Sequence, residues 1–240
     1  MVDLNCDLGE SYGAFAGGPD EALVEVITSA NIACGAYAGD PSSMRRTCAR
    51  AITHGVAIGA QVGYPDLLGF GRRFIDIAPQ ELVDSVVHQI GALAVFARVT
   101  GGRVTYVKPH GALYHAVIHH EAQARAVVRA VEEYGDGLVL LGAPDSELGR
   151  AAASSGIEFV VEGFADRRYG ADGRLVPRSE PDALLTDPEE AMAQALRLAR
   201  DGIRSICVHS DTPGAVEIAR RVRAGLADAG HPLAPFTRTR

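Results

Sequence analysis

The run Asp3-Leu4-Asn5-Cys6-Asp7, near the start of the chain, alternates polar and apolar side chains. Successive side chains of a β-strand point to opposite faces, so Asp3, Asn5 and Asp7 share one face, while Leu4 and Cys6 share the other. We expect the apolar face to pack against helices and the polar face to point inward. Burying three polar groups on one face is costly unless they meet partners or a ligand. The run therefore predicts a strand that contributes to a functional site.

Short β-branched runs of this kind alternate with longer amphipathic stretches along the whole chain. The expected strands are Val2–Cys6, Ala30–Ala33, Val56–Val62, Val104–Val107, Leu138–Leu141, Glu158–Val161 and Ser205–Val208. The expected helices are Asp20–Thr28, Ser42–Thr53, Gln80–Thr100, Glu121–Tyr134, Ser146–Ser154, Glu189–Arg200 and Gly214–Ala229. A strict alternation of this kind predicts parallel strands with right-handed crossovers. By itself it leaves open whether the sheet is an open doubly wound one or a closed barrel.

Two helix starts carry recognisable signals. Asp187-Pro188-Glu189-Glu190 combines a capping residue, a first-turn proline and a capping-box glutamate, and Thr212-Pro213 repeats the pair of cap and proline. We expect each signal to open the helix that follows it.

Length and composition limit the class of protein. A chain of 240 residues with 47% hydrophobic residues suits one α/β-barrel domain over residues 1–240. A net charge of −7 without a Lys/Arg run argues against nucleic-acid binding. The acidic start lacks a signal-peptide pattern, and no later segment approaches the roughly 20 apolar residues of a membrane span. We therefore expect a cytoplasmic protein with no membrane partner.

Polar residues also gather at the ends of two later strands, where α/β folds build their sites. Lys108 and His110 follow an apolar run and share one face. An ammonium can stabilise a phosphate or an oxyanion, and an imidazole can transfer a proton, so this pair suits amide or phosphoryl chemistry. His209 and Asp211 end the last strand in the same way.

Four acidic candidates also have a structural interpretation. Asp7 and Glu10 could cap a turn or the next helix, and Asp211 could satisfy the start of the last helix. Asp40 precedes Pro41, which is a common N-cap pattern, and the residues alone favour that interpretation for Asp40.

Two loops supply guanidinium groups. The loop from Tyr64 to Arg73 contains glycines next to Arg72, and the long polar loop Gly163–Pro181 contains Arg167 and Arg178. Arginine matches the geometry of carboxylates and phosphates, so these loops could close over an anionic ligand. A solvated loop is the alternative for the first of them.

Several familiar motifs are missing from the sequence. It contains no G-x-x-x-x-G-K-[ST] phosphate loop, no G-x-S-x-G nucleophile elbow and no H-E-x-x-H zinc helix. The four cysteines are scattered without a C-x-x-C pair, so neither a zinc knuckle nor a redox motif is indicated. The sequence does not suggest a lone ATPase, a serine hydrolase or a zincin.

Six blocks taken together resemble the LamB/YcsF family, in order, from Asp3 to about Leu226. These blocks are DLNCDLGESYG, SANIACGAYAGDP, GAQVGYPDLLGFGRR, VKPHGALY, FADRRYGADGRLVPRS and ICVHSDTPGA. The resemblance implies a seven-stranded, TIM-barrel-like (β/α) barrel of the glycoside hydrolase/deacetylase type. It also implies an ATP-dependent 5-oxoprolinase activity that opens the lactam of 5-oxoproline to glutamate, in which a chain of this kind works with B and C subunits. ATP, accompanied by Mg²⁺, would be the co-substrate of that complex, and a homo-oligomer is also compatible with the sequence.

Carried over position by position, the resemblance and the strand-end pattern give two sets of candidates. The expected catalytic residues are Asp7, Lys108, His110 and Asp211. The expected substrate-binding residues are Asn5, Glu10, Asp40, Gln61, Arg72, Arg167, Arg178 and His209. In the mechanism that this implies, Asp7 or His110 is the general base, Lys108 and an arginine stabilise oxygen charge, and Asp211 orients His209.

The chain departs from the family pattern at two positions where members often have histidine, namely Tyr37 and Gln61. A tight zinc site draws most of its affinity from imidazoles or thiolates. We therefore expect no tightly bound transition metal, although related deacetylase barrels use one. Two alternatives to the lactam-opening role are a metal-assisted deacetylase or amidohydrolase, and a non-catalytic scaffold subunit.

Overall fold

Parallel pairing of the short strands produces a closed barrel in the computed structural model, which describes residues 1–237. The strands, hydrogen-bonded in chain order, are β1 Asp3–Leu8, β2 Ser29–Ala33, β3 Ala57–Val62, β4 Val104–Pro109, β5 Val139–Gly142, β6 Phe159–Phe164 and β7 Ser205–Val208. Closure comes from β1, where Asn5 lies opposite Ser29 of β2 and Cys207 of β7. The structure confirms the seven-stranded barrel and excludes the open sheet.

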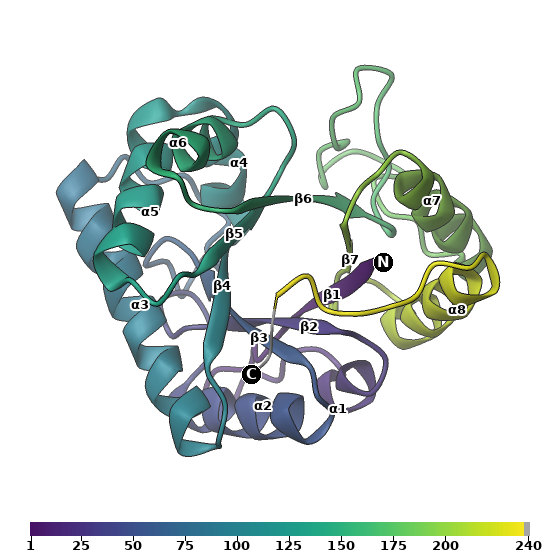
Figure 1. Ribbon diagram of the computed structural model, residues 1–240, viewed down its shortest axis with the longest axis horizontal. Coiled ribbons are helices and arrows are strands. Elements are labelled where there is room, and N and C mark those ends of the chain that lie inside the picture. Colours follow the sequence, from purple (N-terminus) through teal and green to yellow (C-terminus); the bar gives the residue numbers. More distant parts are fainter. Residues whose placement is uncertain (238–240) are drawn as a thin grey trace.

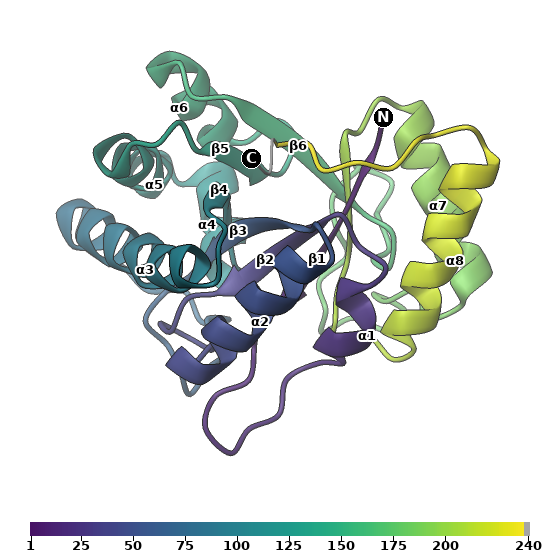
Figure 2. The same ribbon diagram turned by 60° about the horizontal axis from the view of Figure 1, so that its bottom comes forward.

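Helices surround the barrel (Figure 1). They are α1 Asp20–Val24, α2 Pro41–Thr53, α3 Pro79–Val99, α4 Gly111–His119, α5 Glu121–Tyr134, α6 Glu147–Ser155, α7 Pro188–Arg200 and α8 Ala215–Asp228. Figures 1 and 2 both show α7 beside α8. The short helix α4 was not expected from the sequence.

The two predicted helix starts have different outcomes. Asp187 caps α7, because its carboxylate accepts hydrogen bonds from the amides of Glu189 and Glu190. The expectation for Thr212 is wrong. Gly214 in a left-handed conformation precedes α8, and the Thr212 hydroxyl donates to Asp166 instead.

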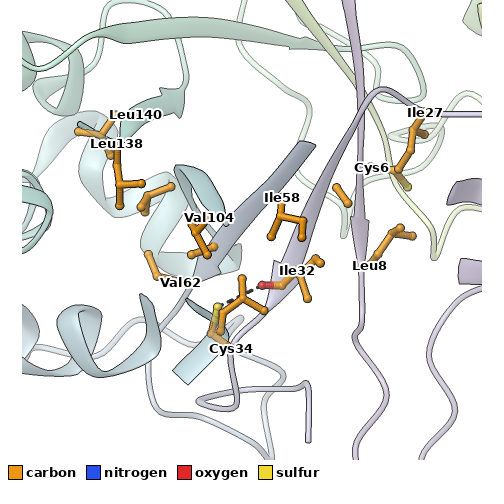
Figure 3. Packing of buried hydrophobic residues seen from close by; sticks show 14 of the residues in the cluster. Cys6, Leu8, Ile27, Ile32, Cys34, Ile58, Val62, Val104, Leu138 and Leu140 are labelled. Carbon is orange, nitrogen blue, oxygen red and sulfur yellow. Dashed lines mark hydrogen bonds between the residues drawn. The ribbon is translucent and has the colours of Figure 1, made fainter. Parts of the chain in front are cut away.

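The side chains of β1 alternate between an apolar face and a polar face, as predicted from the sequence. Leu4, Cys6 and Leu8 are fully buried in the core between the strands and the helices. Figure 3 shows Cys6 beside Ile27, and Ile32 beside Ile58 of the next strand. The opposite faces of the strands are left to line the interior of the barrel.

The C-terminal segment covers the end of the barrel at which the strands begin. It runs back from α8 across that end (Figures 1 and 2), and Leu233 forms a bridge with Val2. Phe236 packs on Tyr106, with ring centroids 4.8 Å apart. Ligand access is therefore left to the opposite end, where the strands finish.

Tyr106 lies between Phe236 of the C-terminal segment and the polar interior of the barrel. Its hydroxyl donates to Asn31 Oδ1 at 2.7 Å, and its ring lies so close to Gly59 that a Cβ there would come within 2.1 Å of it. Gly59 is therefore required by the close approach of this ring.

Helix α3 corrects one expectation from the sequence. Its 21 residues are long and apolar enough to cross a membrane by length and composition alone. In the structure Leu82, Ile90 and Leu93 of α3 are fully buried in the core, and the helix packs against α5 and the strands β3 and β4. This is the environment of a core helix in a barrel.

Candidate active site

The inward polar face of β1 is held by hydrogen bonds in the lower part of the barrel. The Asp3 carboxylate accepts from the hydroxyls of Thr28 and Ser29, each at 2.6 Å. Asn5 donates to Ser205 Oγ and accepts from Asn31 Nδ2, both at 2.8 Å. The expected ligand-binding residue Asn5 is thus a buried part of the support beneath the site.

Lys108 lies between two carboxylates in the centre of the barrel. Its Nζ is 3.2 Å from Asp7 Oδ1 and 3.0 Å from Glu162 Oε2. Burial alone would raise the pKa of Asp7, but the Lys108 ammonium and two nearby histidines lower it to about 2. Burial likewise opposes the charge on Lys108, yet Asp7, Cys207 and Glu162 raise its pKa well above the ordinary value. Asp7 and Lys108 therefore form a charged pair, as their shared inward orientation suggested.

A cavity of about 650 Å³ opens above this pair, at the ends of the strands. Its polar lining comes from β1 and β4 and the residues directly after them, from helix α4, and from the loops after β3, β6 and β7. These side chains are Asp7, Glu10, Arg72, Lys108, His110, His115, Arg167, Arg178, His209 and Asp211. Most of the predicted site residues therefore do meet around one space.

His110 is engaged on both ring nitrogens. Its Nε2 lies 2.9 Å from the Phe70 carbonyl oxygen, which can only accept, so Nε2 carries the proton. Nδ1 lies 3.1 Å from Gln61 Nε2, and the ring stacks on Tyr37 with centroids 3.8 Å apart. Burial lowers the pKa of His110 to about 4. These contacts make His110 an anchor for the loop that carries Arg72, and they argue against its predicted role as a proton carrier.

His209 has a different partner from the one expected. Its Nδ1 lies 2.9 Å from Asp166 Oδ1, and its backbone amide donates to Asp166 Oδ2 at 3.0 Å. Asp166 is fully buried, which raises its pKa, but the His209 imidazole and several hydrogen bonds keep that pKa below the ordinary value. The expectation that Asp211 orients His209 is therefore wrong, because Asp166 does so. This pairing leaves His209 Nε2 for a ligand in the cavity.

Asp211 instead joins the two arginine-bearing loops. Its Oδ2 accepts from Arg72 Nη2 at 2.6 Å and from Arg178 Nη1 at 2.8 Å. Burial would raise the pKa of Asp211, but the two guanidinium groups hold it far below the ordinary value. The predicted cationic loops do meet at the cavity, and a carboxylate of the protein occupies the position between them.

Three other predicted ligand-binding residues have mainly structural contacts. Asp40 caps α2, accepting from the amides of Ser42 and Ser43, and it is absent from the cavity lining. Gln61 is fully buried behind His110. The Arg167 guanidinium reaches the cavity wall but donates to the carbonyl oxygen of Val176 at 2.7 Å, which holds the long loop in shape.

Glu10 is one of the buried groups of the site that have an oxygen without a hydrogen-bond partner among the described residues. Its Oε1 is buried without a hydrogen-bond partner among the described residues and lies 3.6 Å from His110 Nδ1. Burial, with Asp7 and Asp211 nearby, raises the pKa of Glu10 well above its ordinary value. The environment of Glu10 therefore favours its protonated form, whereas that of Asp7 favours the carboxylate.

The deacetylase-like fold raises the question of a metal. Donor atoms of Asp7, Glu10 and His110 lie within 4.8 Å of one another. However, the Lys108 ammonium already contacts Asp7, and the Gln61 amide points at His110 Nδ1. These contacts of Asp7 and His110 do not suit a tightly held transition metal.

Two acidic residues of the site were missed in the sequence. Glu162 is a lone charged residue in the apolar run of β6, and inward alternation from that strand would have identified it. Asp166 directly precedes Arg167 on the long polar loop. Its approach to His209 joins residues 43 positions apart, for which the sequence offers no local signal.

Comparisons with known proteins give the family of the chain over nearly its whole length. The family model described as "LamB/YcsF family" matches residues 2–240. A protein of Streptomyces avermitilis, named as the A subunit of 5-oxoprolinase, is 51% identical over 98% of this chain and all of the relative. A protein of Nocardia farcinica with the same name is 52% identical, over 98% of this chain and 99% of the relative.

Solved structures give the same result for the fold. The crystal structure of a lactam utilization protein from Thermus thermophilus has a TM-score of 0.92 and 40% identity, covering 99% of this chain and all of that one. The structure titled "T48 deacetylase with substrate" has a TM-score of 0.56 at 14% identity, covering 98% of this chain and 87% of that one, so it shows a shared fold alone.

We predict that the free energy of unfolding depends less on pH below about 6.5 in His110→Gln than in wild type. Because burial lowers the pKa of His110 from 6.5 to about 4, the unfolded chain binds its proton more readily between those values. The stability due to neutral His110 is complete above about pH 6.5 and is lost as the pH falls towards 4, with a cost on the order of 3 kcal/mol. A Gln amide can still donate to the Phe70 carbonyl.

Urea unfolding of both proteins near neutral pH and near pH 4.5 measures this difference. The gap in unfolding free energy between the two pH values should be about 2 to 3 kcal/mol smaller in His110→Gln than in wild type. The exposed substitution His119→Gln is the control and should behave as wild type. Equal gaps in all three proteins would contradict the buried neutral state of His110.

Proposed function

The chain belongs to the LamB/YcsF family, and on this basis we propose that it is the A subunit of an ATP-dependent 5-oxoprolinase, a hydrolase that opens the lactam of 5-oxoproline to give L-glutamate. The observation that carries the proposal is the full-length match, at 51% identity, to a relative named as the A subunit of 5-oxoprolinase. The cavity supports it, because its lining combines groups suited to proton transfer with groups suited to binding anions.

The chemistry explains the need for ATP. A lactam carbonyl is a poor electrophile and its nitrogen is a poor leaving group, so transfer of the terminal phosphoryl group of ATP to the ring oxygen activates the carbon. Water can then add to that carbon, and the carbon–nitrogen bond breaks. A second water releases phosphate from the resulting acyl phosphate of glutamate. The site must supply a base that accepts a proton from the attacking water and an acid that protonates the leaving nitrogen. It must also supply a positive charge that stabilises negative charge on oxygen.

His209 is the best-placed base for water. Asp166 accepts from its Nδ1, which fixes the ring and leaves the lone pair of Nε2 directed at a ligand. His209 also lines the cavity and stacks on Phe164, with ring centroids 5.2 Å apart. The proton of the attacking water would pass to this nitrogen.

Glu10 is the matching acid. Asp7 and Glu10 are two carboxyl groups whose environments separate their pKa values, since Lys108 keeps Asp7 ionised while burial and neighbouring carboxylates keep Glu10 neutral. Pairs separated in this way commonly divide the acid and base roles. Glu10 would give its proton to the ring nitrogen as the carbon–nitrogen bond breaks, and Lys108 would stabilise negative charge at the ring oxygen.

The cofactor and the partners follow from the same proposal. ATP with Mg²⁺ is the co-substrate of the complex, and the lack of a phosphate-loop motif in this chain favours nucleotide binding by the B and C partner subunits. Residues 1–240 would act as one catalytic barrel domain in the cytoplasm. The crowded Asp7, Glu10 and His110 cluster does not favour the metal-assisted deacetylase, and the Asp166–His209 pair does not favour a purely structural role.

We predict that glutamate forms only from the complete mixture. The purified chain, candidate B and C proteins, ATP and 5-oxoproline are combined, and glutamate is measured with each component left out in turn. The chain alone should neither open 5-oxoproline nor bind ATP tightly in calorimetry. Glutamate formation that is unaffected by omitting this chain would contradict the assignment, and strong nucleotide binding to the chain alone would place phosphorylation here.

We predict that His209→Gln lowers kcat by 100-fold or more, as removal of a general base commonly does. Asp166→Asn should lower kcat at least tenfold with little change in KM, because it misorients His209 without touching the substrate. Both variants should still assemble with the partner subunits. The exposed His119→Gln is the matched control, and near-normal kcat in His209→Gln would exclude His209 as the base.

We predict that the purified protein contains no stoichiometric zinc or other transition metal. Lys108 and the Gln61 amide occupy positions where ligand atoms would have to face an ion. Elemental analysis after gel filtration gives the metal content. A stoichiometric transition metal whose removal abolishes turnover, and whose return restores it, would favour the amidohydrolase instead.

A further inference from the structure

Two guanidinium groups from different loops share one carboxylate oxygen at the mouth of the cavity. Arg72 comes from the loop after β3, Arg178 from the loop after β6, and Asp211 follows β7. Both arginines donate to Asp211 Oδ2, at 2.6 and 2.8 Å. The side chains are 43%, 28% and 36% exposed for Arg72, Arg178 and Asp211, respectively, so this cluster is in contact with solvent.

An exposed cluster of this kind can exchange its anion. Two neighbouring guanidinium groups repel each other unless an anion lies between them, and Asp211 supplies that anion here. Exposed ion pairs contribute little stability, because water and salt compete with them. A ligand carboxylate bound by two arginines could therefore replace Asp211 at low cost, with the bidentate geometry that guanidinium groups favour.

The distribution of charge in the cavity gives such a ligand one orientation. At the floor, the Lys108 ammonium lies between two carboxyl groups, that of Asp7, which lines the cavity, and that of Glu162, which is buried outside the cavity lining. At the mouth, the guanidinium groups of Arg72 and Arg178 share one carboxylate, that of Asp211. An anionic group is thus favoured at the mouth, which leaves the uncharged end of the ligand near the floor of the cavity.

We propose that Arg72 and Arg178 form the receptor for the carboxylate of the substrate, and that Asp211 occupies this receptor until the substrate displaces it. The proposal rests on the proposed function, since 5-oxoproline carries one carboxylate beside its lactam ring. It makes the two arginines specificity-determining: a lactam with a carboxylate on the ring is accepted, and the same ring without it is not. Asp211 is then an internal competitor of the substrate.

A purely structural role for the cluster makes the opposite prediction. If Asp211 only joins the two loops, removing its charge loosens the site and weakens every ligand. If Asp211 competes with the substrate, removing its charge frees the arginines and strengthens the binding of carboxylated ligands. The direction of change in Asp211→Asn therefore separates the two roles.

The experiment measures binding of two probes, 5-oxoproline and 2-pyrrolidinone, to the full chain by calorimetry. Wild type should bind 5-oxoproline at least tenfold more tightly than 2-pyrrolidinone, which is the same ring without the carboxylate. Arg178→Gln should abolish this preference, and Asp211→Asn should bind 5-oxoproline several-fold more tightly. Arg174→Gln changes an exposed arginine on the same long loop and is the matched control.

The same variants are assayed in the complex with its partner subunits, and melting temperatures confirm that each is folded. KM for 5-oxoproline should rise at least tenfold in Arg178→Gln and fall in Asp211→Asn. Equal weakening of both probes by Arg178→Gln, or weaker 5-oxoproline binding and a higher KM in Asp211→Asn, overturns the receptor. The proposal is also overturned if wild type binds 5-oxoproline no more tightly than 2-pyrrolidinone.

The outcomes also separate this inference from the proposed function. If wild type forms glutamate but Arg178→Gln keeps the preference for the carboxylated ring, the receptor is wrong and the 5-oxoprolinase assignment stands. If no glutamate forms but the chain prefers the carboxylated ring through Arg178, the reaction is wrong and the receptor stands.

Discussion

The buried charge of Lys108 is the constraint around which the interior of the barrel is organised. An ammonium cannot be removed from water at an acceptable cost unless carboxylates surround it, and Asp7 and Glu162 approach it from two other strands. Their remaining hydrogen-bonding capacity requires further partners in turn, which Asn5 and Asn31 provide. One charge thus fixes which face of four strands points inward, and it makes the polar interior a connected network.

That network also sets the chemical character of the cavity above it. Because Lys108 contacts Asp7, the pKa of this carboxyl group is lowered, whereas burial and two neighbouring carboxylates raise the pKa of Glu10. The two histidines divide in a comparable way. His110 uses one nitrogen on the carbonyl oxygen of Phe70 and the other on Gln61 of β3, while His209 uses one nitrogen on Asp166 and presents the other to the cavity. Similar side chains therefore serve as support or as reactive groups according to their partners.

Much of the fold could be predicted from local patterns. Every expected strand is present, and the alternation in β1 correctly divided Leu4, Cys6 and Leu8 from the polar face. The predicted charged residues of the site, except Asp40, also meet around one cavity, because parallel strands bring their ends to the same side of a barrel. The pairings within that cavity were less predictable. Asp211 was expected to orient His209, because the two residues lie close together at the end of the last strand. The path of the chain instead directs the Asp211 carboxylate towards Arg72 and Arg178.

The sequence by itself determined the order of the strands and of every helix except α4, the inward polar face and most of the charged residues that line the cavity, because these depend on periodicities of a few residues. Only the tertiary structure decided that the sheet closes, that Glu162 joins Lys108, that Asp166 orients His209 and that His110 is held neutral. Each of these depends on contacts between segments far apart in the chain and on the removal of water from between them. Local sequence patterns do not encode those distances, whereas the closed barrel fixes them.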